Sequence, residues 1–277
     1  MRIKTNNNIS SNLKKKKFLV SILITNYNKE KFIKNTLQSC VNQNIREKQI
    51  IVYDDASTDN SYNIIKKFKG IEIIINKKKK LTSAALNQIS GIIESFKRSK
   101  GEIIFLLDGD DEFKKGKLKF ITNIFRSDKN LNFIQDRPYL SSKKKLMKLK
   151  IKNHYFSIWP SFYPTSCMTV KRDFFKKFIK FSYPKEFPNL EVDARIAIFS
   201  HLKKNFKKIN KNLTVYNNDE YGITSKYPKY SISWWKKRND AFSYLMRISK
   251  KMNIKFNYSP DFFLTRVINF LILKILN

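Results

Sequence analysis

Short apolar stretches alternate with segments of helical spacing through the first half of this chain. The strand-like stretches are residues 18–25, 49–53, 71–75 and 103–107, and the helix-like segments are residues 31–42, 57–68 and 82–96. Such alternation is typical of a parallel sheet with helices on both of its faces. The sequence therefore predicts an α/β fold with a mostly parallel central sheet flanked by helices.

The second half of the chain is less regular, and its elements are expected to be mainly helical. We expect strands at residues 131–139 and 213–216, and helices at 174–181, 193–204, 232–251 and 261–276. The last of these helices is unusually apolar. It is expected to pack on its own domain, on a second copy of the chain, or on a membrane surface backed by lysines.

Three carboxylates follow the apolar run of residues 103–107, namely Asp108, Asp110 and Asp111. They repel one another, and a solvated turn would not need all three. Hard cations such as Mg²⁺ are held by one or two carboxylates together with substrate phosphates. In open α/β sheets, ligands bind at the carboxyl ends of the strands, which is where this cluster is expected.

Two further strand ends carry polar side chains, Asn26-Tyr27-Asn28 after the first strand and Asp54-Asp55 after the second. Neighbouring strands lie about 4.8 Å apart, so such ends can line one crevice. A tyrosine ring would suit a base, a carboxylate would suit a ribose, and a bound cation would suit a diphosphate. The sequence has no glycine-rich phosphate loop, so a phosphate would be held through the cation, unlike in NAD or ATP enzymes.

The net charge of +35 suggests an anionic partner, but its composition argues against specific nucleic-acid binding. Only ten of the 57 basic residues are arginine, the residue favoured for bidentate phosphate contacts. A/T-rich codons produce such lysine-rich sequences, although attraction to an anionic membrane or substrate stays open. With no apolar run of 18 residues, no signal-peptide pattern and only two cysteines, the chain is expected to be cytoplasmic with reduced thiols.

Three blocks of the sequence together resemble the signature of family 2 glycosyltransferases. The blocks are VSILITNYN at residues 20–28, IIVYDDASTD at 50–59 and GEIIFLLDGDD at 101–111. Leu86-Asn87 fits the middle block of the family, although the glycine usual near it is displaced to Gly91. The resemblance covers residues 18–115 and implies the GT-A (Rossmann-like) fold of nucleotide-diphospho-sugar transferases, here with a helical C-terminal extension.

The resemblance also implies roles for individual residues. Asp110 would ligate Mn²⁺ or Mg²⁺ on the donor diphosphate, and Asp108 would face the ribose or the metal. Asp54 or Asp55 would accept a hydrogen bond from the base, with a uracil-type nucleotide favoured. The full substrate-binding set is Asn26, Tyr27, Asn28, Asp54, Asp55, Asn87 and Asp108.

Family 2 enzymes invert the sugar configuration, so a carboxylate must take the proton of the acceptor hydroxyl. The family usually has an adjacent acidic pair at the start of a helix in the second half, where this chain has Glu191-Val192-Asp193. We expect Asp193 to be the base, with Glu191 as the alternative. Both could instead only stabilise the amino end of the helix.

Together these features predict a metal-dependent inverting glycosyltransferase that uses a nucleotide-sugar donor and a cell-envelope glycan or lipid-linked acceptor. We expect a basic flexible segment at 1–17, a catalytic domain at 18–225 divided into a donor half (18–125) and an acceptor half (126–225), and the extension at 226–277. A sugar nucleotidyltransferase should instead carry a glycine-rich loop with arginine, and residues 25–29 lack glycine. The other alternative is a basic nucleic-acid-binding protein. Peripheral contact with the inner membrane face and a homodimer are further expectations.

Overall fold

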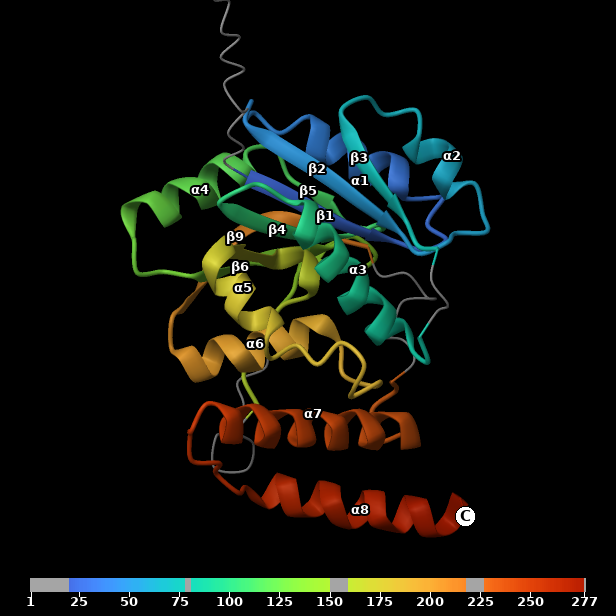
Figure 1. Ribbon diagram of the computed structural model, residues 1–277, viewed down its shortest axis with the longest axis vertical. Coiled ribbons are helices and arrows are strands. Elements are labelled where there is room, and N and C mark those ends of the chain that lie inside the picture. The colour runs from blue at the N-terminus through green and yellow to red at the C-terminus, as the bar shows by residue number, and fades with distance from the viewer. Residues whose placement is uncertain (1–19, 78–80, 150–158, 218–226, 277) are drawn as a thin grey trace, which may run out of the picture.

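The computed structural model describes residues 20–77, 81–149, 159–217 and 227–276. Within these ranges, nine strands form one sheet in the order β3-β2-β1-β4-β8-β6-β9-β5, with β7 paired to β6 (Figure 1). The strands are β1 (Val20–Asn26), β2 (Lys48–Asp54), β3 (Ile71–Ile75), β4 (Ile103–Asp108), β5 (Glu112–Phe113), β6 (Phe133–Leu140), β7 (Lys145–Leu146), β8 (Met168–Lys171) and β9 (Phe206–Tyr216). The predicted α/β class is confirmed.

The sheet is mostly parallel, with one reversed strand near its middle. β1 pairs in parallel with β2 and β4, and β2 does so with β3. β8 is antiparallel to both β4 and β6, and β9 is parallel to β6. The strands β1 to β4, β6 and β9 therefore end at the same edge of the sheet, which is where a ligand site is expected.

Helices cover both faces of the sheet (Figure 1). They are α1 (Ile33–Val41), α2 (Ser61–Ile65), α3 (Ala84–Arg98), α4 (Lys117–Ser127), α5 (Arg172–Ile179), α6 (Val192–Lys203), α7 (Ile232–Lys251) and α8 (Pro260–Leu276). Ile22 and Ile24 of β1 pack with α1 and α4, whereas Leu23 packs with α3, α5 and α6 on the other face. Burial on both faces explains the uninterrupted apolar runs of the central strands.

Several elements differ from the prediction. β5, α4 and β8 were not predicted, β9 begins at Phe206 rather than at residue 213, and α2 is shorter than the expected helix at 57–68. β8 has only four residues, and the first half of β9 is rich in lysine with largely exposed side chains, so neither has a clear apolar pattern. Tertiary pairing rather than local sequence forms these strands.

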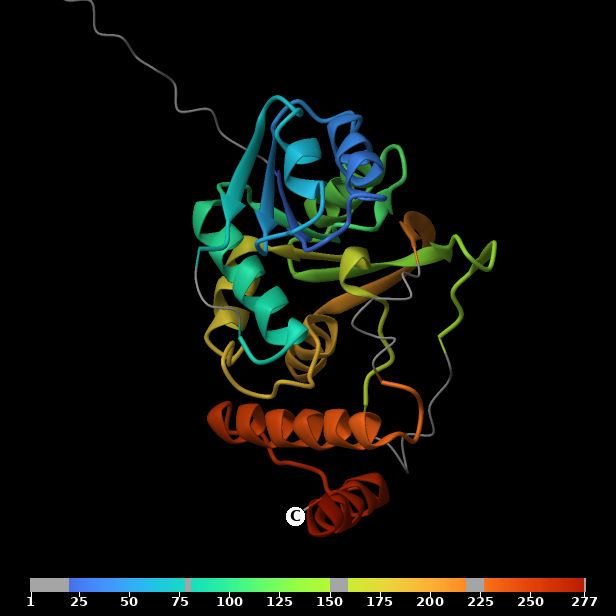
Figure 2. The ribbon, with the colours of Figure 1, turned by 90° about the vertical axis from the view of Figure 1, so that its right-hand side faces the viewer.

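The last two helices lie beyond α6, on the far side from β1 to β3 (Figures 1 and 2). Phe242 of α7 is fully buried in a cluster with Ile198 of α6, and Phe262 of α8 joins the same cluster. Among the described residues, no helix combines the length and apolar character needed to cross a bilayer. The helical C-terminal extension is thus confirmed, whereas the domain boundaries stay a prediction, and residues 1–17 lie outside the described ranges.

Candidate active site

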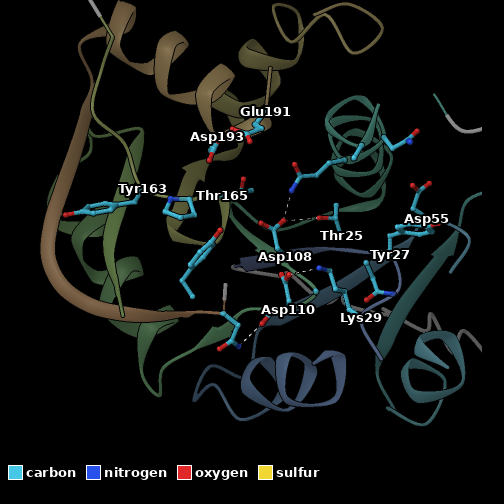
Figure 3. A pocket seen from close by; sticks show the side chains of 18 of the residues that line it. Thr25, Tyr27, Lys29, Asp55, Asp108, Asp110, Tyr163, Thr165, Glu191 and Asp193 are labelled. Atoms are coloured by element: carbon cyan, nitrogen blue, oxygen red, sulfur yellow. Dashed lines mark hydrogen bonds and ion pairs between the residues drawn. The ribbon is translucent and has the colours of Figure 1, made fainter. Parts of the chain in front are cut away.

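A cavity of about 750 Å³ opens at the edge of the sheet where the parallel strands end. One wall consists of the ends of β1, β2 and β4 with the start of α3, and the other of residues 162–165, the start of α6 and the end of β9 (Figure 3). The strand register explains how the first wall forms. Asn26 lies opposite Asp54, and Thr25 lies opposite Asp108, so three predicted strand ends do converge.

Asp108 is held firmly at the end of β4. Its Oδ1 accepts hydrogen bonds from Gln88 Nε2 at 2.7 Å and from Thr25 Oγ1 at 3.2 Å. Its backbone N–H donates to Ser166 Oγ at 3.0 Å. Burial, together with the neighbouring Asp110 carboxylate, raises the pKa of Asp108 to about 7. This wall therefore holds negative charge poorly unless a cation is close.

Gly109 allows the acidic turn to lie against β1. A Cβ at this position would be 2.7 Å from Asn26 Oδ1 and 3.1 Å from the Thr25 carbonyl oxygen. Both neighbours are held by the sheet, so neither can move away easily. The glycine between Asp108 and Asp110 is thus required by packing.

Asp110 lies beside Asp108 in the cavity wall and forms an ion pair with Lys29. Lys29 Nζ is 2.7 Å from Asp110 Oδ2, and Asn217 Nδ2 donates to the Asp110 carbonyl oxygen at 2.7 Å. Asp111, the third acidic residue, is fully buried, and its Oδ1 accepts from the Asn217 backbone N–H at 2.8 Å. Asp111 therefore supports the turn, whereas Asp108 and Asp110 line the cavity.

Three of the predicted nucleotide-binding residues line the cavity near the ends of β1 and β2, namely Asn26, Tyr27 and Asp55. The Tyr27 side chain is 46% exposed, so its ring is accessible to a ligand. Asp55 Oδ1 accepts from Asn76 Nδ2 at 2.7 Å. Asn87 also lines the cavity, and its Oδ1 accepts from the Leu81 backbone N–H at 2.8 Å, which holds the loop before α3.

The remaining predicted residues hold the loops around the cavity. Asp54 is 2% exposed and accepts from Asn26 Nδ2 at 2.7 Å and from Ser57 Oγ at 2.6 Å. Asn28 has a φ of 51°, and its Oδ1 accepts from the Thr58 backbone N–H at 2.8 Å. Asp54 and Asn28 are not among the lining residues, so Asp55 is better placed than Asp54 to meet a base.

The two candidate bases enter the cavity from the start of α6, across from Asp108 and Asp110 (Figure 3). Glu191 forms an ion pair with Lys237 of α7, while its Oε1 is buried without a hydrogen-bond partner. Burial and the nearby Glu191 carboxylate raise the pKa of Asp193 to about 8. Asp193 Oδ1 also accepts from the Ala194 backbone N–H at 2.7 Å, so the helix-stabilising role is compatible with the structure.

Several lining residues were not singled out individually from the sequence. They are Thr25, Lys29, Gln88, Tyr163, Thr165 and Asn217. Lys237 of α7 also lines the cavity. Gln88 directly follows Asn87, so its place beside the middle sequence block was the only sequence feature that could have identified it.

The acidic wall suits a divalent cation only together with phosphate oxygens. Among the described residues, no cluster of three His, Cys, Asp or Glu side chains could hold a metal ion by itself. Asp108 and Asp110 nevertheless offer hard oxygen atoms, and Mg²⁺ is commonly held by one or two carboxylates plus substrate phosphates. Burial and the Asp110 carboxylate raise the pKa of Asp108 even with Lys29 nearby, so a further cation would stabilise the ionised carboxylate. The residues therefore fit such a cation.

A family model described as glycosyl transferase family 2 matches residues 21–206, which is more than half of the chain. This chain belongs to glycosyl transferase family 2. Membership of this family favours glycosyl transfer over the nucleotidyltransferase and nucleic-acid-binding alternatives.

Individual relatives are similar over shorter segments. This glycosyltransferase is 38% identical over 93 residues to WfaP of Escherichia coli, described as a UDP-Glc:α-D-GlcNAc-diphosphoundecaprenol β-1,3-glucosyltransferase. That alignment covers 34% of this chain and 36% of WfaP, so the chain matches only about a third of this curated relative.

Solved structures match over most of the glycosyltransferase. S. aureus TarS residues 1–349, in complex with UDP-GlcNAc, superimposes with a TM-score of 0.60 at 14% identity over 89% of this chain and 79% of that chain. The mannosyltransferase PcManGT from Pyrobaculum calidifontis, in complex with GDP-Man and Mn²⁺, gives a TM-score of 0.55 at 13% identity over 91% and 69%. These matches show the expected GT-A fold.

Proposed function

We propose that this glycosyltransferase transfers a sugar, with inversion and with Mn²⁺ or Mg²⁺, from a nucleoside diphosphate donor to a hydroxyl of a cell-envelope glycan or a lipid-linked acceptor. The observation that supports it most is the pair of acidic walls in one cavity. Asp108 and Asp110 lie on one wall, and Glu191 and Asp193 lie on the other. One pair suits the donor diphosphate, and the other suits the acceptor hydroxyl.

The donor nucleotide is proposed to contact Tyr27 and Asp55. The exposed tyrosine ring suits stacking with a base, and the Asp55 carboxylate can accept the N–H of a uracil ring. A uridine diphosphate sugar is therefore favoured. The printed descriptions of WfaP and TarS, which name UDP-Glc and UDP-GlcNAc, support the same choice.

Asp108 and Asp110 are proposed to hold the divalent cation together with the donor diphosphate. When bound, the cation would supply Lewis-acid stabilisation of the charge that develops on the leaving nucleoside diphosphate. Lys29 already lies 2.7 Å from Asp110, so its ammonium group adds a second positive charge at the same place. Thr25 and Gln88 keep the Asp108 carboxylate oriented toward the cavity by their hydrogen bonds.

Asp193 is proposed to be the general base, ahead of Glu191. The Glu191 carboxylate is engaged in an ion pair with the Lys237 ammonium group, so it is less free than Asp193 to meet an acceptor hydroxyl. The raised pKa of Asp193 makes its ionised form a stronger proton acceptor near neutral pH. Asp193 would take the proton of the acceptor hydroxyl as that oxygen attacks the sugar from the face opposite the leaving diphosphate.

The acceptor is proposed to be a lipid-linked or envelope glycan reached from the cytoplasmic face of the membrane. The WfaP description names a diphosphoundecaprenol-linked acceptor, which supports a lipid-linked substrate. Peripheral contact through lysines and the C-terminal helix would bring the cavity to such an acceptor. Homodimer formation is the competing use of that helix.

The donor proposal is tested by thermal unfolding with a panel of nucleotide sugars and nucleoside diphosphates, each with Mn²⁺, Mg²⁺ or EDTA. A ligand at a hundredfold excess over its Kd stabilises the folded state by about 2.7 kcal/mol. We expect a uridine nucleotide with metal to raise the Tm, and Asp110→Asn to abolish the metal-dependent part. Asp173→Asn, an exposed carboxylate on α5, is the matched control. Absence of metal-dependent stabilisation by every nucleotide would contradict the proposal.

A further inference from the structure

Helix α8 exposes six large apolar side chains, whereas its polar Thr265 and Asn269 are buried. The exposed residues, here called the outer face of α8, are Phe263 (57%), Leu264 (53%), Val267 (56%), Phe270 (57%), Leu271 (50%) and Leu273 (57%). Their spacing places them along one side of the helix. A surface helix of a globular protein normally has the opposite arrangement, with its apolar side toward the core.

The inner face of α8 is attached to α7 largely by polar contacts. Asn269 Nδ2 donates to the Trp235 carbonyl oxygen at 3.0 Å. Arg266 donates to Asn239 Oδ1 at 2.6 Å and to Ser243 Oγ at 3.1 Å. These contacts fix the rotation of the helix, so the outer face cannot turn inward without losing them.

The ion pair between Asp261 and Arg238 strengthens this attachment at the start of α8. Among the described side chains of α8, Phe262 is the only large apolar one that is buried, at 8% exposure. The burial of Phe262 against Phe242 anchors the helix on α7. The orientation of α8 is therefore built into the fold.

Helix α8 lies at the end of the molecule farthest from β1 to β3, as both ribbon views show (Figures 1 and 2). Among the described residues, α8 packs mainly against α7. Contiguous exposed apolar side chains of this number mark an interaction site rather than ordinary surface.

The charge of the segment that carries this face indicates which partner suits it. Residues 227–277 contain ten lysines and arginines but only two aspartates and no glutamate. Of these basic residues, Lys237 lines the cavity, and Arg238 and Arg266 are engaged between α7 and α8. Lys274 lies in the last turn of α8, with its Nζ 4.9 Å from the Phe270 ring centre, and Lys255 is exposed in the loop before α8. Two copies of a chain with net charge +35 repel each other, whereas an anionic bilayer attracts each nearby lysine or arginine by about 1 kcal/mol.

We propose that α8 lies flat in the interface of an anionic lipid bilayer, with its outer face in the acyl region. The 17 residues of α8 span about 25 Å at 1.5 Å per residue, which is too short for a span but sufficient for an interfacial helix. Phenylalanine and leucine on one side and basic residues at the margin are the features of such helices. This surface is separate from the cavity. The bilayer contact rests on the peripheral membrane contact of the proposed function, and it assigns that contact to the outer face of α8 and to anionic lipid.

The test is flotation of the full-length protein with vesicles. Phosphatidylcholine vesicles containing 30% phosphatidylglycerol are compared with pure phosphatidylcholine vesicles, at low salt and at 0.5 M NaCl. We expect binding to the anionic vesicles, a partition coefficient at least tenfold lower on neutral vesicles, and weaker binding in salt.

Two matched variants locate the contact. Phe263→Gln with Phe270→Gln changes the outer face and should lower the partition coefficient at least tenfold. Val41→Gln with Ile75→Gln changes two other exposed apolar residues, at 37% and 40% exposure, and should leave binding unchanged. Circular dichroism and the Tm of each variant verify that it folds.

Three results would overturn the proposal. The first is absence of wild-type binding to anionic vesicles, and the second is equal binding by the outer-face variant. The third is a wild-type dimer in sedimentation velocity that the outer-face variant abolishes, without vesicle binding, since that would assign the face to a second copy. No activity is measured, so failure here is separate from failure of the proposed reaction.

Discussion

Replacing Lys117 by methionine should destabilise the protein strongly, because it leaves a buried carboxylate without its cation. Lys117 and Asp136 are both fully buried, with Nζ 2.7 Å from Oδ1. Lys117 Nζ also donates to the Ser166 carbonyl oxygen at 2.8 Å and to Thr214 Oγ1 at 2.6 Å. The ion pair thus joins α4 to β6. Lys117 also contacts β9 and the short turn at Thr165–Cys167, whose Ser166 hydroxyl group accepts from the Asp108 backbone N–H.

The expected loss follows from the charge that remains. Removing one partner of a buried ion pair costs about 3–5 kcal/mol, because the other charge stays in a medium of low polarity. In the variant, Thr214 Oγ1 would still donate to Asp136 Oδ2, at 2.7 Å in the wild type, but a hydroxyl group cannot replace a positive charge. With an unfolding entropy of about 2.1 cal/mol/K per residue over the 277 residues, this loss lowers the Tm by roughly 5–9 °C.

Urea unfolding and thermal melts of three proteins test this reasoning. Lys117→Met should show the full loss, and Lys117→Met with Asp136→Asn should recover at least half of it, since the second change removes the unpaired charge. A loss below about 1 kcal/mol for the single variant would contradict the argument from buried charge. A double variant no more stable than the single one would assign the loss to packing instead.

Four further outcomes are expected at the active site. The transfer rate should rise with pH through about 8, because Asp193 must be ionised to accept a proton, and a rate profile flat from pH 6 to 9 would remove it as the base. Asp193→Asn should lower the rate about 10²–10⁴-fold while donor affinity, measured by calorimetry, stays unchanged. The pKa of Asp193 is raised in the folded state from its usual 3.8, so its contribution to stability is complete below pH 4 and is lost as the pH rises through about 8. In urea unfolding, the decline of the unfolding free energy with rising pH should be smaller for Asp193→Asn than for the wild type. Gly109→Ala should lower the free energy of unfolding by about 1–3 kcal/mol and weaken donor binding, because its Cβ would lie 2.7 Å from Asn26 Oδ1. A variant with the wild-type Tm would show instead that the turn can shift.

The sequence predicted the central strands well because their residues are buried on both faces. β1, β2 and β4 read as continuous apolar runs, and each ends in polar residues that the parallel register brings together. β8 and β9 were harder, since one is very short and the other exposes lysines at its beginning. Their formation depends on pairing partners distant in the chain, which local patterns do not reveal.

The acidic residues of the site were recognisable because they interrupt apolar runs in a lysine-rich chain. Lys29 has no distinguishing feature among so many lysines, and only the fold shows that it meets Asp110. Asn28 and Asp54 belong to the same sequence blocks as the lining residues, yet their side chains hold loops instead. A sequence block can identify a turn without telling which of its side chains face the ligand.

The reversed strand β8 lies between β4 and β6 in the sheet. The wall with Asp108 and Asp110 is complete by residue 110, whereas the opposite wall begins with β6 and includes Glu191 and Lys237. Under the proposed roles, the later segment and the acceptor can change while the donor wall stays intact. Replacing the segment after β4 by the corresponding segment of another family member would therefore be a way to change the acceptor.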